Sequence, residues 1–328
     1  MKTKKELKEE VFALDVTTLP DHVENTGEII ADIIAGSSTL KDLVPMTGAK
    51  ANTQVQLNIL NTDVTWSGAD CVSAETGDNT VIAPRYVDIT RITDREDLCL
   101  DKLDAKLPMI QAAGARNEDL PFSALFIDMK VNKNSKEVEK LAWQGDTAGA
   151  GNMALSDGWL KIASGETADL AFYEAAVVYS AATAIDVVRA KILANRTNDM
   201  FESEDLVIYM ELSNFAILAD AIVDSYGIAG TGMFTNVGNQ NQLGLNEMVF
   251  PGTNVKIKGT AGMNGSNAIF ATSTSNLRYA TDLENDMENV ELYFDKYHKA
   301  LVSDIVFAIG FQYEYTQKVI MLDIVGAE

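Results

Sequence analysis

Cysteine and histidine are scarce in this chain, which carries two residues of each among 328. Metal cages and histidine-activated nucleophiles draw on these residue types, and neither His22 nor His298 lies in a segment that suggests such a site. One side of a predicted hairpin lies between Cys71 and Cys99, and each strand residue adds about 3.3 Å to the distance between them. A disulfide needs Cα atoms within about 7 Å, so we expect two free thiols.

Positive charge is also scarce. Lys and Arg number 26 against 48 Asp and Glu, which gives a net charge of −22. Tight binding to nucleic acid needs clustered cations, so this balance argues against a protein that grips nucleic acid across its surface. A hydrophobic content of 47% excludes wholesale disorder. The first ten residues are charged, which argues against a signal peptide. The apolar stretch 175–194 contains charged residues, which argues against a membrane span. We therefore expect cytoplasmic synthesis.

Familiar catalytic motifs are missing. The sequence has no Gly-Lys dipeptide, and therefore no P-loop, and no G-x-S-x-G nucleophile elbow. The string Gly149–Ala154 fits a dinucleotide fingerprint loosely but follows a predicted helix, so a flexible connection is the better interpretation. An acidic group lacks the glycine of an EF-hand and favours a solvated or interface patch: Asp282, Glu284, Asp286 and Glu288. We expect no enzyme activity, no catalytic residues, no cofactor and no metal.

A long hairpin is predicted over residues 54–92, where apolar and polar residues alternate with period two on both sides. Between its strands, residues 67–80 are rich in Gly, Asp, Asn and Ser and hold too few apolar side chains to form a core. An isolated two-stranded ribbon is marginal in water. The hairpin therefore needs a partner surface, which another copy of the chain can supply.

An amphipathic helix is predicted over Phe122–Trp143, with Pro121 in its first turn and Gly145 at its end. Four lysines fall opposite its apolar stripe: Lys130, Lys133, Lys136 and Lys140. They can face nucleic acid, or they can form a solvated face or salt bridges to an acidic neighbour. The net charge favours the second interpretation.

The remaining segments alternate between predicted helices and strands. A short helix is expected over Glu28–Ala35, a second long helix over Leu170–Asn195, and a third that is capped by Ser213, runs to Val223 and is stopped by Gly227. Strands are expected at 206–210, 255–258, 268–271, 290–294 and 311–316. The layout is α+β.

Five local strings occur in an order that resembles a known family. They are Leu120-Pro121-Phe122, Ala142–Asp146, Asp157-Gly158-Trp159-Leu160, Asp205–Met210 followed by Ser213-Asn214, and Thr281–Asp286. Together with the arm, the ribbon and the long helix, this order resembles the major capsid protein of tailed bacteriophages, a fold shared with encapsulin shells. The resemblance covers nearly the whole chain.

The resemblance implies a tailed-phage major capsid fold in four parts. These are an N-terminal arm (1–50), an extended β-hairpin loop (51–95), a peripheral domain with a long spine helix (96–165 and 270–328), and an axial α/β domain (166–269). Hexamers and pentamers would form around the axial domain and close an icosahedral shell around double-stranded DNA. The implied location is the virion, after assembly in the host bacterial cytoplasm. The implied partners are other copies, a portal, a scaffold, auxiliary capsid proteins and, weakly, packaged DNA, but no membrane.

The resemblance also implies site residues. Inter-subunit contacts are expected from the loop residues Trp66, Asp70, Glu75, Asp78 and Arg85, and an inward basic stripe from Lys130, Lys133, Lys136 and Lys140. No lysine lies between residues 51 and 101, so the covalent cross-linking through a loop lysine known in part of the family is not expected. Two alternatives remain: an encapsulin-like compartment shell around an enzyme cargo, and an acidic hydrolase that uses paired carboxylates.

Overall fold

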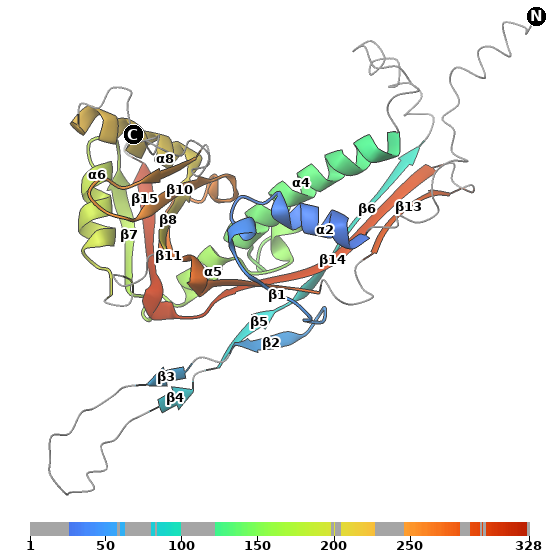
Figure 1. Ribbon diagram of the computed structural model, residues 1–328, viewed down its shortest axis with the longest axis horizontal. Helices are drawn as coiled ribbons and strands as arrows, with labels where there is room; N and C mark the ends of the chain where they lie inside the picture. Colours follow the sequence, from blue (N-terminus) through green and yellow to red (C-terminus); the bar gives the residue numbers. More distant parts are fainter. Residues whose placement is uncertain are drawn as a thin grey trace, which may run out of the picture.

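The computed structural model describes residues 26–57, 60–62, 80–82, 84–99, 122–197, 200, 205–226, 246–282, 289–295, 297 and 300–326. Within these residues the fold consists of two sheets, each covered by helices, and a ribbon that extends away from them (Figure 1). Among the described helices, none is long and apolar enough to cross a membrane.

The first sheet is built around the long strand β14 (Ala300–Tyr313). Four strands complete it: β1 (Pro45–Met46), β12 (Leu277–Thr281), β13 (Asn289–Asp295) and β6 (Thr90–Cys99). On one face lie the helices α4 (Phe122–Gln144), α2 (Thr26–Ala35) and α5 (Trp159–Gly165). Alternate side chains of β14, such as Phe307 and Phe311, point into the core beneath them.

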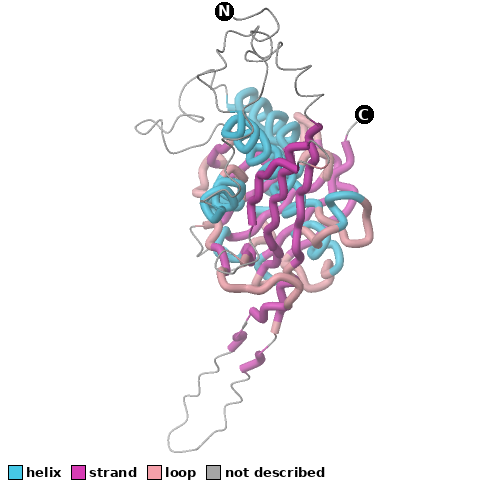
Figure 2. Tube along the Cα trace, turned by 90° about the vertical axis from the view of Figure 1, so that its right-hand side faces the viewer, coloured by secondary structure: helices cyan, strands magenta, loops and turns pink. Residues whose placement is uncertain are grey.

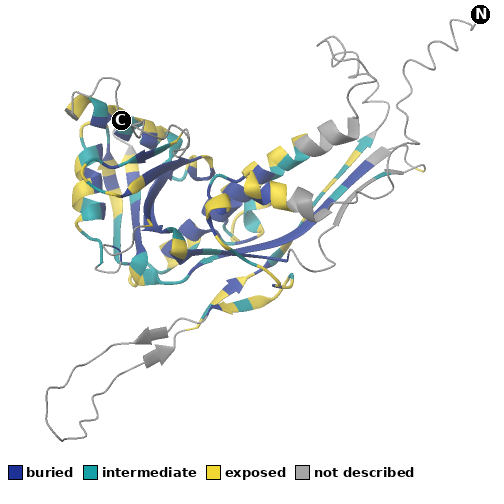
Figure 3. Ribbon diagram, in the orientation of Figure 1, coloured by how far each residue is buried: buried dark blue, intermediate teal, exposed yellow. Residues whose placement is uncertain are grey.

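The second sheet has six strands within the described residues, in the order β7 (Phe172–Tyr179), β15 (Val319–Gly326), β11 (Ala268–Ser273), β8 (Leu206–Glu211), β10 (Lys256–Thr260) and β9 (Glu247–Val249). One face packs on α8 (Leu212–Tyr226), α6 (Ala184–Val187) and the π-helical turn Val188–Leu193. The other face joins the core of the first sheet through Tyr209 and Phe270. Burial on both faces explains why residues 206–210 of β8 form a continuous run of buried, mainly apolar side chains (Figure 3).

Short 3₁₀ turns connect these elements: Leu40–Asp42, Gly151–Ala154, Ala261–Met263, Thr274–Asn276 and Thr316–Lys318.

A cluster of aromatic rings forms around Trp143 and its neighbour Trp159, where the two sheets meet. The Trp143 ring centroid lies 4.9 Å from those of Trp159 and Tyr209 and 5.6 Å from that of Phe270. Trp159 in turn contacts Phe311 of β14 at 5.6 Å. Edge-to-face and tilted ring pairs of this kind add to the hydrophobic burial of the rings themselves. One cluster therefore joins α4, α5, β8, β11 and β14.

The ribbon begins with β2 (Gln54–Leu57) paired to β5 (Arg85–Asp88) and continues with β3 (Leu60–Thr62) paired to β4 (Thr80–Ile82). Figure 2 shows it leaving the two sheets as a narrow extension. Leu57 and Val87 at its base pack on Ala308 of β14, on the face opposite α4. The antiparallel pairing confirms the predicted hairpin at 54–57, 60–62, 80–82 and 85–88. Residues 90–92, which the prediction placed at its end, instead belong to β6 and pair with β14.

The predicted helices at 28–35 and 122–143 and the strand at 206–210 are confirmed. The predicted helix over Leu170–Asn195 is confirmed only in its second half, where α6 and the π-helical turn run from Ala184 to Leu193. Its first half is wrong, because residues 172–179 form β7, parallel to β15. Its apolar residues fit a helical period, but Val177 and Tyr179 alternate into the core of the second sheet. The edge of β15 supplies backbone partners that an isolated helix would not use, so tertiary pairing overrides the local pattern.

The predicted cap at Ser213 is also wrong, because α8 begins one residue earlier, at Leu212. The Leu212 N–H donates instead to Oδ1 of Asn264, at 3.4 Å, so a residue far along the chain satisfies this end of the helix. The stop at Gly227 lies outside the described residues. The strand predicted at 311–316 ends at Tyr313, as the last part of β14.

The segment 270–328, which the predicted division gives to the peripheral domain, contains strands of both sheets. The boundary at 269/270 falls inside β11, and β11 and β15 pair with β8 and β7 in the second sheet. Only β12, β13 and β14 of the segment 270–328 belong to the first sheet. The C-terminal segment therefore contributes to both sheets.

We expect Trp143→Ala to lower the free energy of unfolding of the isolated chain by about 3–5 kcal/mol, because its indole is completely buried. Chemical denaturation followed by circular dichroism measures this loss. Leu155→Ala, at a side chain that is 37% exposed, is the control and should cost less than about 1 kcal/mol. An equally small loss for Trp143→Ala would show that the ring is not a core residue.

Candidate functional site

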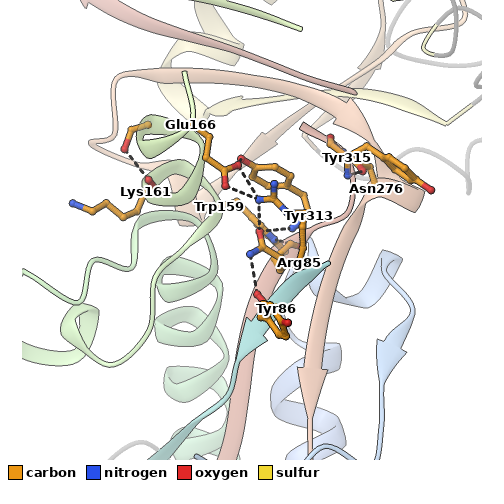
Figure 4. Close-up of polar contacts among 10 residues, drawn as sticks. Arg85, Tyr86, Trp159, Lys161, Glu166, Asn276, Tyr313 and Tyr315 are labelled. Carbon is orange, nitrogen blue, oxygen red and sulfur yellow. Dashed lines mark hydrogen bonds and ion pairs between the residues drawn. The ribbon is translucent and has the colours of Figure 1, made fainter. Parts of the chain in front are cut away.

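The base of the ribbon is held by a polar network around Arg85, the first residue of β5 (Figure 4). The Arg85 Nη2 donates to both carboxylate oxygens of Glu166, at 3.0 and 2.8 Å, and to Oε1 of Gln312 at 3.1 Å. The guanidinium also lies over the ring of Tyr313, 4.6 Å from its centroid. The Arg85 side chain is only 15% exposed, so its ion pair is sheltered from bulk water.

Tyr313 and Gln312 extend this network into the body of the protein, that is, the two sheets and the helices that cover them. The Tyr313 hydroxyl donates to Oε2 of Glu166 at 2.6 Å. Burial, and then this hydrogen bond, raise the pKa of Tyr313, so the phenol stays protonated as a donor. The Gln312 amide donates to the Tyr86 carbonyl at 3.0 Å, and the Trp159 indole donates to the Gln312 carbonyl at 3.1 Å. The network therefore joins β5, β14 and the end of α5.

Close packing of the backbone completes the attachment. A Cβ atom on Gly310 of β14 would lie 2.2 Å from the carbonyl oxygen of Asp88, a distance that no side chain tolerates. Glycine at this position lets β5 approach β14 closely. On the outer side, the Gln54 amide donates to the Asp88 carboxylate at 2.7 Å, which ties β2 to β5.

The arm is attached to α4 by a buried carboxylate. Glu139 accepts hydrogen bonds from the hydroxyls of Ser37, Ser38 and Thr39 and from the Thr39 backbone N–H. The Trp143 indole donates to the Thr39 hydroxyl at 3.1 Å. A buried charge is tolerated only when it is fully hydrogen-bonded, and this one has four donors.

A buried lysine connects the same arm to the second sheet. Lys258 of β10 pairs with Asp42 in the arm and with Glu247 of β9, and its ammonium donates to the Ser38 carbonyl. Its side chain is 8% exposed. The arm is therefore linked to both sheets.

The four predicted lysines of α4 do not form one uniform stripe. Lys130 pairs with Asp94 at 3.1 Å and with Glu96 at 2.7 Å on β6. Burial opposes its charge, but the hydrogen bonds to Glu96 and Asp94 outweigh this effect and raise the pKa of Lys130. Lys130 therefore forms a salt bridge to an acidic neighbour, which is one of the interpretations that the sequence left open.

The other three lysines are exposed and follow one side of α4: Lys133, Lys136 and Lys140. They lie on the face of the first sheet opposite the base of the ribbon, because α4 and β5 cover alternate faces of β14. The ribbon and this lysine row therefore belong to opposite surfaces of the molecule.

Of the predicted loop residues, Trp66, Asp70, Glu75 and Asp78 lie outside the described residues. Arg85 is described, and its side chain contacts its own chain. Asp282 of the predicted acidic patch is buried rather than solvated, and the rest of that patch lies outside the described residues. The described residues contain no group of His, Cys, Asp and Glu able to hold a metal ion.

Sequence reasoning missed the partners of Arg85 and the role of Glu139. Glu166, Gln312 and Tyr313 are distant from Arg85 in the sequence, and no local pattern connects them. Glu139 is one of several acidic residues in a charged stretch of α4. One signal was present, since residues 51–84 contain no Lys or Arg and Arg85 ends that run.

No family model and no curated protein sequence matches this chain. Solved structures match it along its length. A chain of the satellite phage P4 procapsid aligns with a TM-score of 0.57 at 13% identity and covers 100% of this chain and 99% of that one. The capsid of Myoviridae phage XM1 aligns at 0.54 and 11% identity, over 87% and 90% of the two chains. The capsid of a native GTA particle aligns at 0.55 and 12% identity, over 88% and 97%.

These matches establish the fold class. The chain has the α+β fold of tailed-phage major capsid proteins, as its sequence predicted.

We expect Glu139→Gln to destabilise the isolated chain by about 1–3 kcal/mol, because the new amide group would place a donor among hydroxyl and N–H donors. Hydrogen exchange should accelerate at residues 37–43. The matched control is Glu137→Gln, two residues away and exposed, which should leave both exchange and stability unchanged. Equal behaviour of the two variants would contradict the assigned role of Glu139.

Proposed function

We propose that this chain is a major capsid protein, the structural subunit of an icosahedral shell that encloses the double-stranded DNA of a tailed phage. The observation that carries the proposal is the alignment of 87–100% of this chain with chains of a phage procapsid, a phage capsid and the capsid of a GTA particle. The proposed role is architectural: copies associate into hexamers and pentamers, and these close the shell.

The four-part division becomes part of this proposal, with one change. Residues 1–50 are the arm and 51–95 the extended loop. The rest of the first sheet and α4 form the peripheral domain, and the second sheet, which includes β11 and β15, forms the axial domain. Capsomers would form around the axial domain.

The shape of the ribbon supports contacts between copies. At its base only Leu57 and Val87 are buried, whereas Gln54, Gln56, Tyr86 and Asp88 are exposed. A ribbon with one buried side and one exposed side is stabilised when a second surface covers it. We assign that surface to a neighbouring copy, with Trp66, Asp70, Glu75 and Asp78 among the contacting residues.

The remaining partners and the location follow from the same proposal. A portal, a scaffold and auxiliary capsid proteins would act with the shell, which would assemble in the host bacterial cytoplasm and persist in the virion. The lysine row Lys133, Lys136 and Lys140 would face inward and contact packaged DNA weakly. Its position opposite the ribbon base supports this, because the ribbon of the same copy leaves that surface uncovered.

Size-exclusion chromatography and negative-stain electron microscopy of the purified chain test the proposal. Closed shells, or rings of five or six, are the expected result, with a scaffold co-expressed if the chain alone stays soluble. A chain that remains monomeric with its scaffold would contradict the proposal. Shells that enclose an enzyme rather than DNA would instead support the encapsulin-like alternative.

We expect deletion of residues 66–80 to leave a folded, soluble subunit that cannot close a shell. The segment follows β3 in the sequence and ends at Thr80, the first residue of β4, and the described core residues of both sheets lie elsewhere in the sequence. Circular dichroism checks folding, and electron microscopy checks assembly. The control replaces 66–80 with a Gly/Ser segment of equal length, which separates loop length from loop chemistry. Normal particles from the deletion would remove the loop from the assembly mechanism.

We expect glutamine at Lys133, Lys136 and Lys140 together to weaken the binding of subunits to double-stranded DNA at low salt. Each lost phosphate contact should reduce the slope of log K against log salt by about 0.9. Filter binding over a range of salt concentrations measures both quantities.

The matched control carries the same charge change at three exposed lysines elsewhere in the chain, namely Lys41, Lys161 and Lys256. If the two triple variants bind DNA equally, the row on α4 has no specific role.

A further inference from the structure

Arg85 lies where the ribbon is attached to the body, which consists of the two sheets and their helices. On one side lies the body, where β14 and α5 are packed into the aromatic core. On the other side the ribbon continues into β4, away from both sheets (Figure 1). Whatever holds Arg85 therefore influences the direction in which the ribbon leaves the body.

We propose that Arg85 is a positioning residue, which Glu166 and Tyr313 hold so that the extended loop leaves the body at one angle, and that this angle selects the contacts through which copies close into a shell of uniform size. The second half of this inference rests on the proposed capsid function. The first half concerns the isolated chain.

Three separate contacts restrain two consecutive residues. Arg85 forms its ion pair with Glu166 and lies over the ring of Tyr313. The backbone carbonyl of the next residue, Tyr86, accepts from Gln312. An ion pair alone would leave the Arg85 guanidinium free to rotate, but the ion pair, the ring contact and the backbone hydrogen bond of Tyr86 together define an orientation.

Arginine is the residue type that this arrangement requires. Its planar guanidinium can bind a carboxylate and stack on an aromatic ring at the same time, which a lysine ammonium cannot do. No Lys or Arg lies between residues 51 and 84, so the part of the loop that precedes Arg85 has no cation that could take its place.

The length of the ribbon makes a small change of angle important. From Arg85 to Thr80 the chain covers about 16 Å, so a rotation of about 10° at the base displaces Thr80 by about 3 Å. A displacement of that size is as long as a hydrogen bond and is enough to lose a specific contact with a neighbouring copy.

The sequence-based expectation for Arg85 was an inter-subunit contact. The side chain is mostly buried and is engaged within its own chain, so we assign it the internal role instead.

The first test measures the angle directly in unassembled subunits. Spin labels at Thr80→Cys on β4 and Lys136→Cys on α4, with Cys71 and Cys99 changed to Ser, report the distance between ribbon and body. Arg85→Lys and Glu166→Gln should broaden the distance distribution at least twofold. Tyr313→Phe, which keeps the ring and removes only the hydroxyl, should give an intermediate broadening.

The matched control is Asp146→Asn, which removes an exposed ion pair to Lys161 of α5 that does not touch the ribbon. Its distribution should equal that of the unmodified chain. Equal distributions in Arg85→Lys, Glu166→Gln and the control would overturn the inference, whether or not the chain assembles. Unchanged far-ultraviolet circular dichroism in all variants would show that folding is not the cause.

The second test examines assembly by electron microscopy. Arg85→Lys and Glu166→Gln should yield open sheets or shells of several diameters, whereas Asp146→Asn yields the diameter of the unmodified chain. Variants with a broadened loop angle but a uniform, unchanged diameter would overturn the link between angle and shell size. A chain that forms no shell in its unmodified form would count against the proposed function, and the distance measurement would still decide the role of Arg85.

Discussion

The body of this protein depends on the burial of Trp143 where its two sheets meet. This one side chain, near the end of α4, contacts rings from α5, β8 and β11 and donates a hydrogen bond to the arm. Because interiors are packed as densely as organic crystals, elements that share one close-packed cluster cannot shift independently. Glu139, one turn earlier on α4, fixes the arm to the same helix. The two sheets, the helix and residues 26–50 of the arm therefore pack as one unit.

Because the body packs as one unit, the ribbon is attached to a rigid base. Trp159 connects the network of Arg85, Glu166 and Tyr313 to this rigid base, because it both packs against Trp143 and donates to the Gln312 carbonyl. In the proposed capsid role the ribbon covers a neighbouring copy, so an error in its direction would be repeated at every contact of the shell. Many modest contacts that act together are effective only when the geometry allows all of them to form.

Much of the fold could be predicted from sequence, and the failures have definite physical causes. The ribbon strands and α4 follow strong periods of two and 3.6 residues, and both are confirmed. β7 was mistaken for a helix because its apolar positions fit both periods and only the edge of β15 decides between them. The Ser213 cap failed because Asn264, from another segment, lies at the start of α8. For the site, the sequence predicted Arg85 as an inter-subunit contact and gave no sign of its partners within the chain, which are far away in sequence.

The sequence by itself determined the α+β class, the scarcity of catalytic residue types, the long helix and a hairpin without its own core, because composition and local periodicity are properties of neighbouring residues. Only the tertiary structure decided that the C-terminal strands divide between two sheets, that Lys130 is paired while Lys133, Lys136 and Lys140 are exposed, and that Arg85 binds Glu166. These outcomes depend on which distant segments pack together, and that choice is made by the burial of the whole core rather than by any local stretch of chain.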